Sequence, residues 1–153
     1  MLETPHVIVG AAIATKVVNP ALAIPLAFGS HFILEKVPHW NPHLNTEVEK
    51  FGKPTPKSTK IVILDSSIAL ISGTFIAYQA LPDGMLFLTI LMASLASILP
   101  DLVEAPYFFL NIKSKLIARW IRFQKSLQVD TTPLPGLATQ LITIAAALIW
   151  ISS

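Results

Sequence analysis

Four carboxylates of this chain lie inside, or at the edge of, apolar stretches long enough to cross a lipid bilayer. These acids are Glu35, Asp65, Asp101 and Glu104. An ionised carboxylate in the hydrocarbon of a bilayer costs about 2.5–3.5 kcal/mol on insertion scales. Such residues therefore need partners in the folded chain, and a divalent metal ion is a partner that Asp, Glu and His can share.

The composition indicates an integral membrane protein. Apolar residues make up 53% of the 153 residues, and charged residues only 13%, against about 25% in soluble proteins. The mean hydropathy is +0.64. A soluble all-helical protein with an apolar core is the alternative, but several apolar runs approach the roughly 20 residues that span a bilayer. The absence of cysteine excludes thiolate ligands and disulfides, and the basic residues form no nucleic-acid-binding pattern.

The sequence predicts an all-α, polytopic membrane bundle of about five helices in a single domain, residues 1–153. A capping residue followed by proline, at Thr4-Pro5 and again at Asn19-Pro20, starts two short helices that form a hairpin. A polar loop is expected over 38–59. The predicted helices cover about 5–18, 20–37, 60–80, 85–110 and 137–151. A basic amphipathic helix over about 112–127 is expected to lie in the membrane interface.

The distribution of lysine and arginine predicts the orientation in the inner membrane. Lys50, Lys53 and Lys57 lie in the loop after the hairpin, and five more basic residues lie in the amphipathic stretch. The turn over 81–84 has none. By the positive-inside rule the two basic segments are cytoplasmic. The N-terminus is then also cytoplasmic, and the C-terminus lies outside.

This orientation brings ionisable residues from separate helices to one level near the cytoplasmic surface. His31 and Glu35 are four residues apart, and Asp101 and Glu104 three apart, so each pair shares a helix face. Helical bundles build carboxylate–histidine metal sites from such pairs. The predicted ligands of one or two divalent ions, with zinc first and manganese or iron as alternatives, are His6, His31, Glu35, His39, Asp65, Asp101 and Glu104.

The predicted site suggests a metal-dependent hydrolase. Metal ions at this depth would activate water beside lipid headgroups, so the expected substrate is a lipid phosphate or ester. Glu104 is the candidate general base. The candidates for holding substrate phosphate are Lys36, Lys60, Arg119 and Arg122.

Three segments resemble a known family. They are Ser30–Trp40, His6–Gly10 and Leu99–Asp101, and they are similar to the small bacterial and archaeal family of membrane-bound, metal-dependent hydrolases of the LexA-regulated inner-membrane type. The resemblance implies a metal-dependent hydrolase in which His6 and Asp101 occupy matching positions. It covers mainly the first forty residues and the region around Asp101, after which this chain has Leu-Val-Glu where the family has Asp-His.

Other functions remain open from the residues alone. Intramembrane acids also mark cation pathways, so a transporter is an alternative, and a homo-oligomer could build a pore. The His39-x3-His43 spacing is also found in di-iron oxidases, although Pro42 would break the helix that this spacing requires. A metal-binding membrane subunit without catalysis is the remaining alternative.

Overall fold

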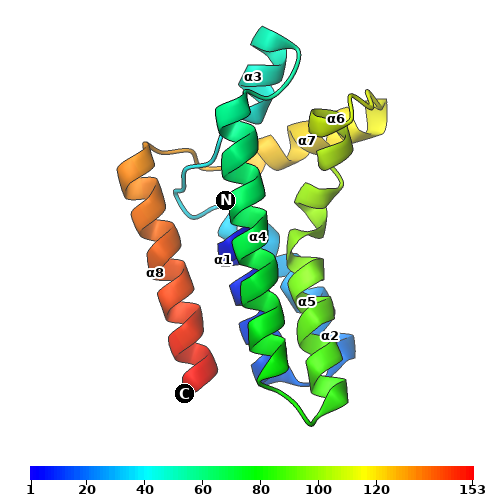
Figure 1. Ribbon diagram of the computed structural model, residues 1–153, viewed down its shortest axis with the longest axis vertical. Helices are drawn as coiled ribbons and strands as arrows, with labels where there is room; N and C mark the ends of the chain where they lie inside the picture. The colour runs from blue at the N-terminus through cyan, green and yellow to red at the C-terminus, as the bar shows by residue number, and fades with distance from the viewer.

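A computed structural model describes all 153 residues. It contains eight α-helices and no β-strand, which confirms the all-α prediction. The helices are α1 (Glu3–Val17), α2 (Pro20–Leu34), α3 (Leu44–Phe51), α4 (Pro56–Tyr78), α5 (Gly84–Leu102), α6 (Ala105–Phe109), α7 (Lys115–Leu127) and α8 (Pro133–Ser152). Three of them, α4, α5 and α8, are long and apolar enough to cross a membrane. They run side by side, with α3, α6 and α7 at one end and the C-terminus at the other (Figure 1).

Helix α1 is the centre of the bundle. It packs against α2, α4, α5 and α8, and it is apolar on every side, as expected of a helix enclosed by others. Small residues let the neighbouring backbones approach closely. Gly10 of α1 lies close against α5, because a Cβ atom there would lie 2.9 Å from the carbonyl oxygen of Ala93 and 2.8 Å from Oγ of Ser97.

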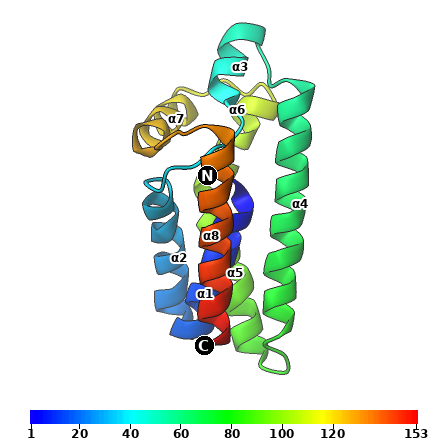
Figure 2. The same ribbon diagram turned by 90° about the vertical axis from the view of Figure 1, so that its left-hand side faces the viewer.

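Helices α1 and α2 form the predicted hairpin, but the predicted Thr4 cap is wrong, because α1 begins at Glu3 with Leu2 in the N-cap position. The side chain of Asn19 accepts a hydrogen bond from the backbone of Ala21 at 3.0 Å, and Pro20 opens α2. Each helix has 15 residues and is therefore about 22 Å long, shorter than the roughly 30 Å hydrocarbon core of a bilayer. The start of α1 and the end of α2 do not reach the level of the start of α4 (Figure 2). Residues in these two segments, such as His6 and His31, are therefore buried within the bundle.

Two predicted segments differ from the structure. The loop expected over 38–59 contains α3, a short helix that ends at Gly52 in the left-handed conformation, with φ of 75°. The helix expected over 85–110 ends at Leu102, and α6 follows as a separate helix. Pro106 lies in the first turn of α6, where its missing N–H is tolerated, and it could not have continued the hydrogen bonding of α5.

Helix α7 lies across the end of the bundle and does not run along the long helices (Figure 2). The indole N–H of Trp120 donates to the carbonyl oxygen of Pro100 at 2.9 Å and so ties α7 to the end of α5. The segment after α7 then runs beside the end of α2, where the backbone N–H of Val129 donates to the carbonyl oxygen of Glu35 at 3.1 Å. These contacts place α7 over the buried ends of α1, α2 and α5.

Helix α3 is fastened to the start of α4 by the carboxylate of Glu47. This side chain accepts hydrogen bonds from the backbone N–H of Thr55 at 2.7 Å, from its hydroxyl at 3.1 Å, and from the hydroxyl of Ser58 at 2.6 Å. Partial burial acts to raise the pKa of Glu47, but the hydrogen bonds from Ser58 and Thr55 outweigh it and hold the pKa below the ordinary value of 4.5. The charged carboxylate is therefore the form that stabilises this contact.

A pH-dependent opening of α3 follows from this arrangement. Because the folded pKa of Glu47 is depressed, its contribution is present above pH 4.5 and is lost as the pH falls through the folded value. We expect Glu47→Gln to weaken the contact by about 1–2 kcal/mol at pH 7 and to remove its pH dependence. Amide-exchange protection of residues 44–58 at pH 7 and pH 3.5 measures this. The exposed neighbour Glu49, changed to Gln, should leave both values unaltered.

Candidate metal centre

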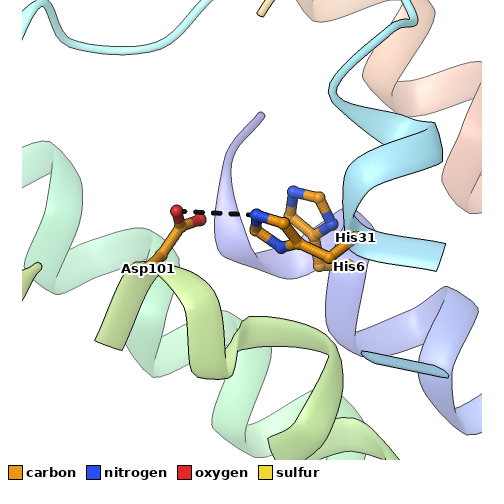
Figure 3. A group of neighbouring side chains, drawn as sticks. All are labelled: His6, His31 and Asp101. Atoms are coloured by element: carbon orange, nitrogen blue, oxygen red, sulfur yellow. Dashed lines mark ion pairs between the residues drawn. The ribbon is translucent and has the colours of Figure 1, made fainter. Parts of the chain in front are cut away.

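Three potential metal ligands from three helices meet in the interior of the bundle. Single ligand atoms of His6, His31 and Asp101 all lie within 4.8 Å of one another. Both histidines are 0% exposed, and their rings stack with centroids 4.2 Å apart. Figure 3 shows the carboxylate of Asp101 pointing at the imidazole ring of His31. All three residues are among the seven ligands predicted from the sequence, and the structure brings these three together.

Each of these residues is placed by the end of a helix. His6 lies in the first turns of α1, His31 in the last turn of α2, and Asp101 in the last turn of α5, directly after Pro100. The close approach of α1 and α5 at Gly10, one turn after His6, sets the spacing between the first and the third of these helices. The cluster therefore depends on helix packing and not on a flexible loop, which favours a rigid site.

The hydrogen bonds of His31 define what this cluster can bind. Its Nδ1 donates to the carbonyl oxygen of Ser97 at 2.9 Å, because a carbonyl oxygen can only accept. Its Nε2 lies 3.0 Å from Oε1 of Gln124 and 3.7 Å from Oδ1 of Asp101. Both of these oxygens are acceptors, so a proton on Nε2 or a cation shared with Asp101 satisfies the contact.

The orientation of the Gln124 amide is fixed by its other contacts. Its Nε2 donates to Asp101 at 3.0 Å and to Glu104 at 3.1 Å. Turning the amide over would direct its oxygen at two carboxylates, so Oε1 stays on the side of His31. Two ligands about 2.1 Å from one ion at tetrahedral angles lie about 3.4 Å apart. The 3.7 Å between His31 and Asp101 is close to this separation, so the residues present fit a divalent cation.

Glu35 and His39, two further predicted ligands, lie beside this cluster. Glu35 is 1% exposed and His39 is 0% exposed. Oε1 of Glu35 is 3.2 Å from Nε2 of His6 and also contacts the amino group of Met1, while its Oε2 is 3.6 Å from Nε2 of His39. Burial is the main cause that lowers the pKa of His39 below its ordinary value. Glu35 therefore stands between two buried imidazoles.

Asp65 was predicted as a ligand, but the structure places it outside the three-residue group and uses it to cap α1. Its carboxylate accepts hydrogen bonds from the backbone N–H of Glu3 at 2.5 Å and of Thr4 at 3.3 Å, and from the hydroxyl of Thr4 at 2.6 Å. A carboxylate at a helix N-terminus satisfies free N–H groups and interacts favourably with the helix dipole. This structural role accounts for its burial.

A cavity of about 170 Å³ opens beside the cluster, between α4, α6 and the start of α3. Four carboxylates line it, those of Glu3, Asp65, Asp101 and Glu104, and Phe108 and Phe109 add an apolar part. Burial, followed by the charge of Asp101, raises the pKa of Glu104 to about 8. Asp101 is the member of the cluster that lines the cavity, so the cavity reaches the cluster on the side of this carboxylate.

The four residues predicted to hold substrate phosphate do not line this cavity. Lys36, Lys60, Arg119 and Arg122 are all exposed on the surface. The cationic side chain that does line the cavity is Lys125, which pairs with Asp130. Lys125 could not be distinguished in the sequence from the other basic residues of α7, because it reaches the cavity only when α7 lies across the bundle.

Gln124 and Glu3 also belong to this site, although neither was predicted from the sequence. Gln124 is 2% exposed and is hydrogen-bonded to three residues of the site. A signal for it was present, since Gln124 follows Ile121 by three residues and Trp120 by four and so belongs to the apolar face of α7. Glu3 had no such signal, because its carboxylate is enclosed only by contacts distant in sequence.

No protein-family model matches this sequence, and no curated protein or solved structure is significantly similar to it. The fold and the site define an all-helical protein with three membrane-length helices and a buried His–His–Asp cluster. Any function has to be inferred from that geometry.

Proposed function

We propose that this protein is a membrane-embedded, metal-dependent hydrolase that acts on a lipid phosphate or ester at the cytoplasmic surface of the inner membrane. The observation that carries the proposal is the convergence of His6, His31 and Asp101, with ligand atoms within 4.8 Å of one another, next to a cavity. Buried imidazole and carboxylate groups that converge in this way can share a divalent cation.

The arrangement of charges supports the proposed placement in the membrane. The basic residues of α7 and those around the start of α4 lie at one end of the bundle, and the C-terminus lies at the other (Figure 1). Helix α7 also exposes apolar side chains, with Leu116 75% and Phe123 48% exposed, as expected of a helix in the membrane interface. By the positive-inside rule this end faces the cytoplasm, which brings the cluster to headgroup depth with the C-terminus outside.

His6, His31 and Asp101 are the residues that would hold the ion, with zinc as the first candidate and manganese or iron as alternatives. Gln124 positions the Asp101 carboxylate through its 3.0 Å hydrogen bond. When bound, the ion would lower the pKa of a water molecule and polarise a phosphoryl or ester oxygen. Ligands carried by the ends of packed helices need little rearrangement to bind it.

The cavity supplies the remaining roles. Glu104 lines it next to Asp101 and is the candidate general base, a role in which a bound cation would have to lower its raised pKa. Phe108 and Phe109 give the cavity an apolar part suited to the acyl or prenyl portion of a lipid, and Lys125 offers a cationic group to a phosphate. The exposed residues Lys36, Lys60, Arg119 and Arg122 are assigned the broader task of attracting anionic headgroups to this face.

Metal content tests the proposal. Protein purified in detergent without chelator should contain zinc, manganese or iron at about one ion or more per chain, and Asp101→Asn should lower the bound metal at least about tenfold. Asp83→Asn is the matched control, because Asp83 caps α5 at the far end of the bundle and Asn can replace that cap. Metal-free wild-type protein that cannot be reconstituted would contradict the proposal.

Activity separates the hydrolase from its alternatives. A panel of lipid phosphates and lipid esters in mixed micelles should show turnover by the wild-type protein that is lost with EDTA and restored by metal. Metal binding without turnover of any panel member would leave a metal-binding subunit. Metal binding together with cation flux into protein-containing vesicles would indicate a transporter.

A further inference from the structure

We infer that a second divalent cation binds between the carboxylate of Glu35 and the imidazole of His39, so that the site takes two ions joined by Glu35. The inference rests on the proposed metal centre at His6, His31 and Asp101. It depends on a different set of atoms, Oε2 of Glu35 and Nε2 of His39, which are 3.6 Å apart.

Both of these atoms are buried without a hydrogen-bond partner. Glu35 is 1% exposed and His39 0% exposed, and neither Oε2 of the first nor Nε2 of the second has a donor or acceptor within reach. Nδ1 of His39 lies 2.8 Å from the carbonyl oxygen of Val37, so it carries the ring proton, and Nε2 of the neutral ring is a lone pair. Two acceptors therefore face each other, an arrangement that costs free energy unless a cation lies between them.

The distance favours a metal ion over a shared proton. A charged imidazole that donates to a carboxylate comes within about 2.7–2.9 Å, well short of the 3.6 Å observed. Two ligands of one tetrahedral ion lie about 3.4 Å apart. The Glu35–His39 pair thus has the spacing of two ligands of one ion.

The backbone around His39 is held on both sides. The N–H of His39 donates to Val129 at 3.0 Å, and its carbonyl oxygen accepts from Thr131 at 2.9 Å. The start of α8 presses on the same segment, because a Cβ atom on Gly136 would lie 2.4 Å from the backbone nitrogen of Trp40. These contacts hold the backbone of His39, and the 2.8 Å contact between its Nδ1 and the carbonyl oxygen of Val37 sets the direction of the ring, as a preorganised ligand requires.

Glu35 connects this position to the first cluster. Its other oxygen, Oε1, is 3.2 Å from Nε2 of His6 and in contact with the amino group of Met1. One carboxylate thus has an oxygen on each side, toward a ligand of the first ion and toward His39. Paired ions in hydrolytic enzymes, about 3.5–4 Å apart, stabilise both the attacking and the leaving oxygen, so this inference points to phosphoryl or ester transfer and away from simple metal storage.

Counting ions tests the inference. Wild-type protein should bind two Mn²⁺ or Zn²⁺ per chain by titration and elemental analysis, and its Mn²⁺-loaded form should show the spin-coupled EPR spectrum of a close pair. His39→Gln should bind one ion and give the spectrum of an isolated Mn²⁺. His43→Gln, a change at an exposed histidine, should still bind two.

The outcomes separate this inference from the proposed function. If the wild-type protein saturates with a single ion that is lost in His31→Gln and retained in His39→Gln, the first centre stands and the second is refuted. If the wild-type protein binds no ion, both are refuted. Because the count and the EPR spectrum are measured first on the wild-type protein, the test does not depend on the folding of a variant; Glu35→Gln is the second variant expected to bind one ion.

Discussion

Replacing Gly10 with alanine is expected to destabilise the protein by about 3 kcal/mol, at the upper end of the range for overpacking a core. The new methyl group would lie 2.8 Å from Oγ of Ser97 and 2.9 Å from the carbonyl oxygen of Ala93. The second of these atoms belongs to the backbone of α5, so the collision cannot be relieved by turning a side chain. Helices α1 and α5 would have to move apart.

The same substitution should weaken metal binding. The carbonyl oxygen of Ser97 orients His31, and His6 lies one turn before Gly10 on α1. Moving the two helices apart therefore separates the ligands, and we expect at least a tenfold loss of metal affinity. Unfolding in detergent and metal titration measure the two effects.

Gly29→Ala is the matched control for Gly10→Ala. A Cβ atom at Gly29 meets nothing within 4 Å, and alanine favours a helix over glycine by about 1 kcal/mol. This variant should therefore be as stable as the wild-type protein, or slightly more stable, with unchanged metal affinity. Equal behaviour of the two variants would show that the close approach of α1 and α5 does not hold the site together.

Gln124→Leu is expected to destabilise the metal-free protein by about 3 kcal/mol. Leucine nearly matches the volume of glutamine, but it removes the donor shared by Asp101 and Glu104 and leaves two carboxylates close together. Leaving a buried polar group without its partner costs about 1–3 kcal/mol, and more when the group is charged. The change should also reduce metal affinity, since Asp101 loses its orienting hydrogen bond.

Gln128→Leu provides the comparison on the same helix end. The side chain of Gln128 accepts a single long hydrogen bond of 3.4 Å from the exposed Lys125, so its loss should change stability by less than about 0.5 kcal/mol. Unfolding of both variants in EDTA isolates the polar network from the metal. If Gln124→Leu were as stable as Gln128→Leu, the network would not be a source of stability.

Local signals were sufficient to predict most of the helices. Asn19-Pro20 separates α1 from α2 as expected, and the apolar stretches correspond to α4, α5 and α8, because capping and proline act within a few residues of their own position. Two errors in the predicted helices also arise from relying on local sequence signals. The helix α3 is too short and too polar to stand out, and Pro106 starts a new helix where one long, broken helix was expected.

The sequence predicted which residue types are buried at the site but not which of these residues contact one another. Apolar stretches carry acids and histidines of several helices into the bundle, so their burial could be predicted from local composition. Which of these residues meet depends on the packing of the helices. This packing grouped His6, His31 and Asp101 and assigned Asp65 to the start of α1, and it drew Gln124 in from α7. Glu3 and Asp65 are 62 positions apart in the sequence, and His31 and Gln124 are 93 apart. Such contacts depend on how helices pack against one another, which the periodicity along a single helix does not specify.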